Sequence, residues 1–183
     1  MKKSDFLFLA FVAVLAVSGN TAIWGQGEPT TADDFVARGM WYSQNGDNDR
    51  AIADCTQALR LDPNRFDAYY GRGLSYFNKN DYDRAIADFT QVIRLAPDTA
   101  NAYYRRGRAY VGKGDIDRAI ADFTQTIRLS SNHFDAYFDR GLLYFHRADY
   151  DRAIADFTQV LRIDPNDSDA KQWLDSARQA RGR

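Results

Sequence analysis

The strongest constraint on the fold of this chain is an internal repeat at a constant interval. The hexapeptide Asp-Arg-Ala-Ile-Ala-Asp occurs at positions 49–54, 83–88, 117–122 and 151–156, and we call the interval from each copy to the next the repeat period. Self-similarity at a fixed period of about 20–50 residues is typical of repeat architectures. We therefore expect four stacked copies of one small unit, which divide the chain into 32–65, 66–99, 100–133 and 134–167.

Each unit is predicted to form two helices separated by a turn. In the second unit, Tyr69, Gly73 and Tyr76 follow the spacing of one helical face, and a second periodic stretch runs over 83–93. Glycine marks the intervening break in the first and third units, as expected where a helix ends in the left-handed conformation. Proline follows the second stretch in three units and disfavours helical torsions in the residue before it. Ser131 replaces this proline in the third unit, where we expect a less sharp stop.

The order of landmark residues resembles the tetratricopeptide repeat (TPR), a helix–turn–helix unit of about 34 residues. The second unit carries the aromatic, Gly, Tyr, Ala, aromatic and Pro landmarks as Tyr69, Gly73, Tyr76, Ala85, Phe89 and Pro97. In the first unit, Cys55 stands where the other three have phenylalanine. The resemblance implies an all-α fold, a right-handed TPR solenoid of four helical hairpins. Small residues such as Gly73 and Ala85 would let the two helices of a hairpin approach closely.

The C-terminal segment 168–183 is predicted to be a capping helix, Ser168–Arg181, followed by a short tail. Its apolar side holds Trp173, Leu174 and Ala177, whereas Lys171, Asp175 and Arg178 should stay in water. Stacked repeats need terminal elements with a polar outer face, because each repeat buries its apolar surface only against its neighbours.

The N-terminal segment 1–18 is predicted to be an export signal. Two lysines precede an apolar run over 6–17, which is short for a membrane span and suits a signal peptide better. An uncleaved signal anchor stays open, because Ala22, Ile23 and Trp24 could extend the run. The segment 19–31 is expected to be a flexible linker ending at the helix-capping sequence Thr31-Ala32-Asp33-Asp34. We expect an exported protein, periplasmic or secreted, with membrane contact only if the segment is uncleaved.

Composition and motifs give no support to catalysis. The 24 basic and 25 acidic side chains balance, which offers no broad footprint for nucleic acid, and a mean hydropathy of −0.54 excludes a polytopic membrane protein. Cys55 is the single cysteine and is expected to be an inert buried thiol. His133 and His146 match no familiar zinc spacing and are expected to be exposed near loops. We therefore predict no enzyme and no catalytic, cofactor-binding or metal-binding residue.

An arginine recurs before the landmark glycine of each unit, and an aspartate recurs on the second predicted helix of the same unit. The pairs are Arg38 with Asp54, Arg72 with Asp88, Arg106 with Asp122, and Arg140 with Asp156. We expect each arginine to pair with the aspartate of its own hairpin or with that of a neighbour, forming a ladder along the stack. A motif present in every unit indicates a scaffold role.

The resemblance implies that the first helices line a concave groove that receives a protein or peptide segment. The residues predicted to form this groove are Tyr70, Leu74, Phe77, Tyr104, Arg105, Arg108, Phe138 and Phe145. Aromatic residues at these positions are also common in idealised TPR units, so a scaffold interpretation stays open. A known TPR mode clamps a terminal carboxylate, but only Arg105 suits that chemistry here.

Arg105 and Arg108 are the residues on which the predicted binding mode depends. They are three positions apart and emerge on one helical face, where an acidic side chain or a terminal carboxylate could bind. Alternatively, they pair with Asp135 or Asp139 across the repeat boundary and only help stacking. The favoured function is a non-enzymatic adaptor that binds a protein segment; the alternative is an accessory subunit that binds a small apolar ligand or docks a transporter component.

Overall fold

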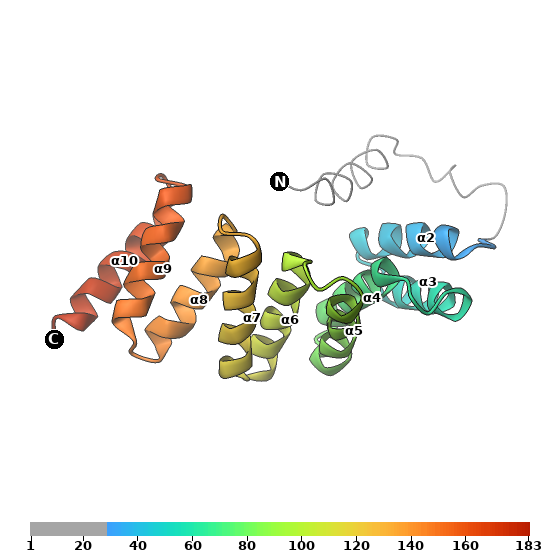
Figure 1. The fold of residues 1–183 in the computed structure, drawn as a ribbon, viewed down its shortest axis with the longest axis horizontal. Coiled ribbons are helices and arrows are strands. Elements are labelled where there is room, and N and C mark those ends of the chain that lie inside the picture. The colour runs from blue at the N-terminus through green and yellow to red at the C-terminus, as the bar shows by residue number, and fades with distance from the viewer. Residues whose placement is uncertain (1–28) are drawn as a thin grey trace. The chain divides into compact units, whose positions relative to one another are not determined.

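Nine α-helices and no strand make up residues 29–183, the part of the chain that the structure, a computed structural model, describes. The helices follow one another as hairpins placed side by side in chain order (Figure 1). Their bounds are α2 Ala32–Gln44, α3 Asn48–Leu61, α4 Phe66–Asn78, α5 Tyr82–Leu95, α6 Ala100–Lys113, α7 Ile116–Leu129, α8 Phe134–His146, α9 Tyr150–Ile163 and α10 Ser168–Arg181. The predicted all-α solenoid of four hairpins and a final helix is confirmed.

The predicted leader, residues 1–18, and most of the linker lie outside the described residues. Thr31 caps α2 as expected: its hydroxyl accepts a hydrogen bond from the backbone N–H of Asp34, whose carboxylate accepts one from the N–H of Thr31. Among the helices described over 29–183, none is long and apolar enough to cross a membrane.

An aspartate begins the second helix of every hairpin. Each of Asp47, Asp81, Asp115 and Asp149 is an N-cap whose carboxylate accepts a hydrogen bond from the backbone N–H three positions later. In the second hairpin, Arg84 Nε also donates to Asp81 at 2.6 Å, which lowers the pKa of that carboxyl. The Arg84 guanidinium lies 4.5 Å from the ring centroid of Tyr76, so the cap also holds the first helix.

The turn inside each hairpin passes through one residue with a positive φ. Gly46 and Gly114 take it at 80° and 78°, as the sequence predicted. Asn80 and Ala148 take the same place in the second and fourth hairpins, at 59° and 57°. The left-handed conformation is costly for a residue with a Cβ atom, and alanine, unlike asparagine, has no side-chain amide to bond locally. The stack thus imposes the turn even where the sequence does not favour it.

The less sharp stop expected at Ser131 is wrong. Helix α7 ends at Leu129, and Ser130 adopts φ −140° and ψ 92°, close to the φ −141° and ψ 102° of Asp62 in the first hairpin. The Ser130 N–H donates to Thr126 O at 2.8 Å. The cap geometry therefore repeats without the proline.

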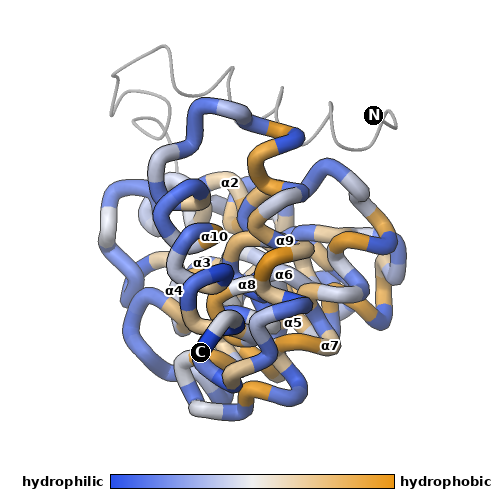
Figure 2. The backbone as a smooth tube through the Cα atoms, turned by 90° about the vertical axis from the view of Figure 1, so that its left-hand side faces the viewer, coloured by the Kyte–Doolittle hydropathy of each residue, from blue (hydrophilic) through white to orange (hydrophobic). Residues whose placement is uncertain are grey.

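Each hairpin is packed around a glycine on the first helix and a buried side chain on the second, which is cysteine in the first hairpin and phenylalanine in the other three. A Cβ atom on Gly73 would lie 2.9 Å from the Phe89 ring, and one on Gly39 would lie 2.9 Å from Cys55 Sγ. Phe89 and Cys55 are fully buried. The tube in Figure 2 alternates between hydrophobic and hydrophilic stretches along its helices, as amphipathic helices in a stack must. The close approach predicted from the glycines is confirmed.

The recurring arginine and aspartate pair within one hairpin. Arg72 Nε and Nη2 each donate to a different oxygen of Asp88 at 2.8 Å, and Arg72 Nη1 donates to Thr56 of the preceding hairpin at 3.2 Å. The equivalent pairs have the same two-bond geometry: Arg38 with Asp54, Arg106 with Asp122, and Arg140 with Asp156. The neighbouring hairpin therefore contributes a threonine rather than a second aspartate.

A second ladder, which the sequence analysis missed, joins successive hairpins. A basic residue at or near the C-terminal end of α4, α6, α8 and α10 pairs with an aspartate in the first turn of the preceding second helix. The pairs are Lys79 with Asp49, Lys113 with Asp83, Arg147 with Asp117, and Arg181 with Asp151. These basic residues recur at the repeat period, a signal that was present in the sequence.

Helix α10 occupies the place of a fifth first helix. Leu174 and Ala177 are buried, Trp173 is half-buried, and Lys171, Asp175 and Arg178 are exposed, as predicted for the cap. Leu174 stands one repeat period after Arg140, where every hairpin has an arginine. No second helix follows α10 within the described residues to supply an aspartate, so an apolar side chain fits there.

Candidate partner-binding surface

Three side-chain contacts show that α4, α6, α8 and α10 follow one another along one surface. The Arg108 guanidinium of α6 lies 5.5 Å from the ring centroid of Phe77 on α4. Tyr104 Oη donates to Asp139 Oδ2 on α8 at 3.0 Å. The ring centroids of Phe145 on α8 and Trp173 on α10 are 5.1 Å apart. We call this surface the first-helix face; its half-buried and exposed side chains are Leu74, Phe77, Arg105, Arg108, Phe138, Leu142, Phe145 and Trp173.

Two residues predicted to line the groove belong to the core instead. Tyr70 is 7% exposed and Tyr104 is 6% exposed. The Tyr70 ring meets Phe89 edge-on with centroids 5.8 Å apart, and the Tyr104 ring lies 5.7 Å from that of Phe123. They are buried because their helical position also faces the large aromatic residue of the second helix. The other six predicted residues keep an accessible side chain.

Arg105 and Arg108 differ from every other arginine and lysine of α2, α4, α6 and α8, because neither pairs with a carboxylate within residues 29–183. The arginines before the glycines and Lys113 all pair. Arg105 and Arg108 contact aromatic rings instead: the Arg105 guanidinium lies 5.8 Å from the Tyr104 centroid. In this described part of the chain no ion pair joins them to Asp135 or Asp139, so that alternative is not borne out, although the nearby charge of Arg108 partly offsets the rise that burial causes in the pKa of Asp139. Two cations on the first-helix face are thus available to a ligand.

A polar cluster separates these arginines from the fourth hairpin. Asp139 accepts the Tyr104 hydroxyl, and burial raises the pKa values of both groups. His133 caps α8 by accepting the Ala136 N–H on Nδ1 at 3.3 Å, and its Nε2 lies 3.2 Å from Asn101 Oδ1. The prediction that His133 is exposed is wrong, because its half-buried ring packs on Tyr104 with centroids 4.8 Å apart. His146 is exposed, as expected.

The sequence analysis placed Trp173 only on the apolar side of the cap. In the structure, its ring contacts Phe145 and also lies 6.4 Å from the Phe157 centroid. Trp173 follows Asp139 by one repeat period and Arg105 by two, so it continues their register on α10. That spacing was the sequence signal that could have placed Trp173 on the first-helix face.

Cys55 has no catalytic environment. Its thiol is fully buried, and burial raises its pKa to about 12, so it stays protonated and poorly nucleophilic at neutral pH. This agrees with the inert thiol predicted from the sequence. Among residues 29–183, no group of three or more potential metal ligands comes together.

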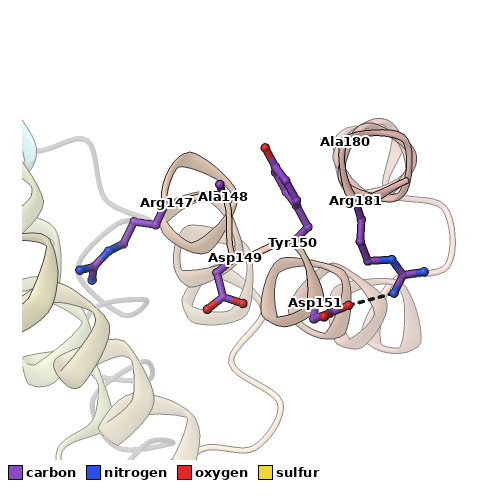
Figure 3. A pocket seen from close by; sticks show the side chains of 7 residues that line it. All are labelled: Arg147, Ala148, Asp149, Tyr150, Asp151, Ala180 and Arg181. Atoms are coloured by element: carbon purple, nitrogen blue, oxygen red, sulfur yellow. Dashed lines mark hydrogen bonds and ion pairs between the residues drawn. The ribbon is translucent and has the colours of Figure 1, made fainter. Parts of the chain in front are cut away.

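A shallow depression of about 420 Å³ lies between the α8–α9 turn and the end of α10 (Figure 3). Its charged side chains already have partners: Arg181 reaches Asp151 at 2.9 Å, Arg147 pairs with Asp117, and Asp149 accepts Arg152 Nε at 2.6 Å. The depression is open and polar, so its features do not suit a small apolar ligand.

Comparison with known proteins agrees with this geometry. The family model described as Tetratricopeptide repeat matches residues 36–100, 72–111 and 104–168. This chain belongs to the tetratricopeptide-repeat family. No curated protein matches its sequence.

Solved TPR structures match most of the chain. A crystal structure of MamA is 26% identical, with a TM-score of 0.78, and the match covers 82% of each chain. YrrB, described as a TPR protein with an unusual peptide-binding site, is 24% identical, with a TM-score of 0.73 over 82% of this chain and 78% of YrrB. The first TPR of Spaghetti (RPAP3), bound to an HSP90 peptide, is 25% identical, with a TM-score of 0.61 over 65% of this chain and 97% of the other.

Proposed function

We propose that this TPR protein is a non-enzymatic adaptor that binds a segment of a partner protein on the first-helix face, outside the cytoplasm. The observation that carries the proposal is the pair Arg105 and Arg108, the two cations of α2, α4, α6 and α8 that form no ion pair within the described residues and lie against aromatic rings. A guanidinium group that has no carboxylate partner within the protein can form charge-assisted hydrogen bonds with a carboxylate of a ligand.

The surroundings of the two arginines support a protein ligand rather than a free anion. Leu74 and Phe77 lie on one side of them along the first-helix face, and Phe138, Leu142 and Phe145 lie on the other. Half-buried aromatic residues next to arginine are typical of protein-binding surfaces. The Spaghetti domain, which shares the fold, is bound to a peptide whose sequence, SRMEEVD, is rich in acidic residues.

The proposal is tested by co-purification from a cell-envelope extract followed by mass spectrometry. The test variant is Arg105→Glu with Arg108→Glu, and the matched control is Arg128→Glu with Arg162→Glu, which makes the same change of charge at exposed positions on second helices. We expect the wild type and the control variant to capture the same partner. The test variant should bind that partner more weakly, with a loss of binding free energy of about 1–3 kcal/mol or more. If the test variant melts lower but captures normally per folded molecule, the arginines belong to the scaffold.

The proposed location outside the cytoplasm is tested by the mass of protein recovered after export. We expect residues 1–18 to be absent, because the apolar run is too short for a stable membrane span. Full-length protein with an intact N-terminal methionine in the membrane fraction would instead indicate a signal anchor.

A further inference from the structure

We infer that α10 is part of the partner-binding surface as well as a cap, and that Trp173 takes an apolar side chain of the same segment whose acidic residue meets Arg105 and Arg108. This inference rests on the proposed function. It further specifies the ligand as an internal stretch of chain that carries an acidic residue and then a large apolar residue, rather than a chain end held only by its carboxylate.

The register of Trp173 is the first observation. It lies one repeat period after Asp139 and two after Arg105, so it holds the same position on α10 that those residues hold on α8 and α6. A helix needed only as a cap would present polar side chains at its outer surface. Lys171, Asp175 and Arg178 do so, whereas Trp173 remains half-buried next to the first-helix face.

The packing of Trp173 is the second observation. Its ring meets Phe145 edge-on at 5.1 Å and lies 6.1 Å from the His146 ring. Phe145 in turn meets Tyr150 edge-on at 5.6 Å. These contacts fix the indole in one orientation and leave part of its surface to solvent, which makes it a rigid aromatic anchor for a ligand side chain.

The third observation is that apolar surface lies on both sides of the two arginines. Phe77 contacts Arg108 from α4, and Phe145 on α8 and Trp173 on α10 continue the face on the other side. A peptide that ended at the arginines would leave the α8–α10 side uncovered. If successive first helices are about 10 Å apart, α6 and α10 are separated by about 20 Å, which an extended chain spans with about six residues. The ligand should therefore place its acidic and large apolar residues about six positions apart.

The test uses phage-displayed random peptides of about 12 residues, long enough to span α4 to α10. They are selected on the full chain and counter-selected on the full chain carrying Arg105→Glu and Arg108→Glu. Enriched peptides are then synthesised with an amidated C-terminus, and their affinities are measured for the wild type, Trp173→Leu and Trp41→Leu. Trp41 is 40% exposed at the other end of the stack and serves as the matched control.

We expect the enriched peptides to carry an acidic residue and an aromatic or large aliphatic residue about six positions apart. Trp173→Leu should weaken binding about tenfold, and Trp41→Leu less than about twofold. In a chain with Trp24→Phe and Trp41→Phe, Trp173 is the sole tryptophan, and the amidated peptide should protect its fluorescence from acrylamide quenching.

Two results overturn the inference, and they are distinguishable. If peptides depend on Arg105 and Arg108 but bind Trp173→Leu normally and leave Trp173 quenching unchanged, α10 is only a cap and the proposed function stands. If no peptide survives the counter-selection, the proposed function and the inference both fail.

Discussion

Arg106 and Arg108 lie two positions apart on α6, yet the fold uses them in opposite ways. Arg106 donates two hydrogen bonds of 2.8 Å to Asp122 and a third, of 3.1 Å, to Thr90 of the preceding hairpin. Arg108 is exposed, has no carboxylate partner among the described residues, and lies over Phe77. The first belongs to a contact present in all four hairpins, whereas the second occurs in the third hairpin alone.

This difference shows which positions of the repeat must keep their residue for folding and which positions can vary between copies. The hairpin interior must keep one geometry in every copy, because each hairpin packs on the next in the same way, and only Cys55 departs from the phenylalanine of the other three. The first-helix face carries no such requirement, so Met40, Leu74, Arg108 and Leu142 can share one register. The following predictions test this division between the hairpin interior and the first-helix face.

The largest loss of stability is expected when an arginine is introduced on α10 at the position equivalent to the paired arginines, where no aspartate is present to bind it. Leu174 holds the arginine register on α10 and is buried. Leu174→Arg should lower the free energy of unfolding by about 3 kcal/mol, because it places a charge in an apolar site without a carboxylate. Urea denaturation checks this. The control Gln179→Arg, at an exposed position of the same helix, should change stability by less than about 0.5 kcal/mol. Equal losses would contradict the interpretation.

The paired arginine should matter more than the unpaired one for stability. Arg106→Met leaves the Asp122 carboxylate buried without the two hydrogen bonds that Arg106 donates and should cost about 3 kcal/mol in unfolding free energy. Arg108→Met, the same substitution two positions away, should cost less than about 0.5 kcal/mol.

A double-mutant cycle separates the pair from simple loss of packing. Arg106→Met combined with Asp122→Leu should be less destabilised than the sum of the two single variants, because removing both partners leaves no buried charge. Additive effects would mean that Arg106 and Asp122 stabilise the hairpin independently and that their pairing contributes no coupling energy.

The hairpin interior was predictable from the sequence because the period fixes it. Gly73 and the arginine–aspartate spacing recur in all four units, and Phe89 recurs in three, so one copy predicts most of the others. The face was less predictable. Tyr70 and Tyr104 were assigned to it by register, but the same positions reach the aromatic residues of the second helix.

The rest of the surface depends on contacts between hairpins that no spacing rule contains. The sequence left open whether Arg105 and Arg108 pair with Asp139; in the structure the Tyr104 hydroxyl donates to that carboxylate, and neither arginine forms an ion pair with it. Trp173 was assigned to the cap alone, since its contact with Phe145 crosses from one helix to the next. Whether this surface binds a partner remains a prediction.

The turns test how strongly the stack imposes one conformation. Ala148 has φ 57° where the first and third hairpins have glycine. Ala148→Gly should raise the free energy of unfolding by about 1 kcal/mol, because glycine adopts a left-handed conformation without the Cβ penalty. Gly114→Ala, at the matching turn, should lower it by a similar amount. A destabilising Ala148→Gly would show that the fourth turn is not strained.

The smallest effect concerns His133, at the polar junction between the third and fourth hairpins. Burial lowers the pKa of His133 below its ordinary value, and Arg105 acts in the same direction, whereas Asp135 and Asp139 raise it. The folded state therefore holds the neutral ring, whose Nδ1 accepts the Ala136 N–H. Because the folded pKa is lower, the unfolded chain binds the proton first. The stability contributed by neutral His133 is complete above about pH 6.5 and is lost as the pH falls.

His133→Asn should remove this part of the pH dependence while keeping the cap, because an asparagine oxygen accepts the same N–H at least as well. At neutral pH, we expect its free energy of unfolding to lie within a few tenths of a kcal/mol of the wild type or above it. Urea denaturation between pH 5 and 8 measures both effects. His146→Asn, at an exposed position, is the control and should leave the dependence of the unfolding free energy on pH unchanged. If His133→Asn has the same pH dependence of stability as the wild type, the proton that matters binds to another group. The junction formed by His133, Asp139 and Tyr104 would then be no more sensitive to pH than the repeated interior.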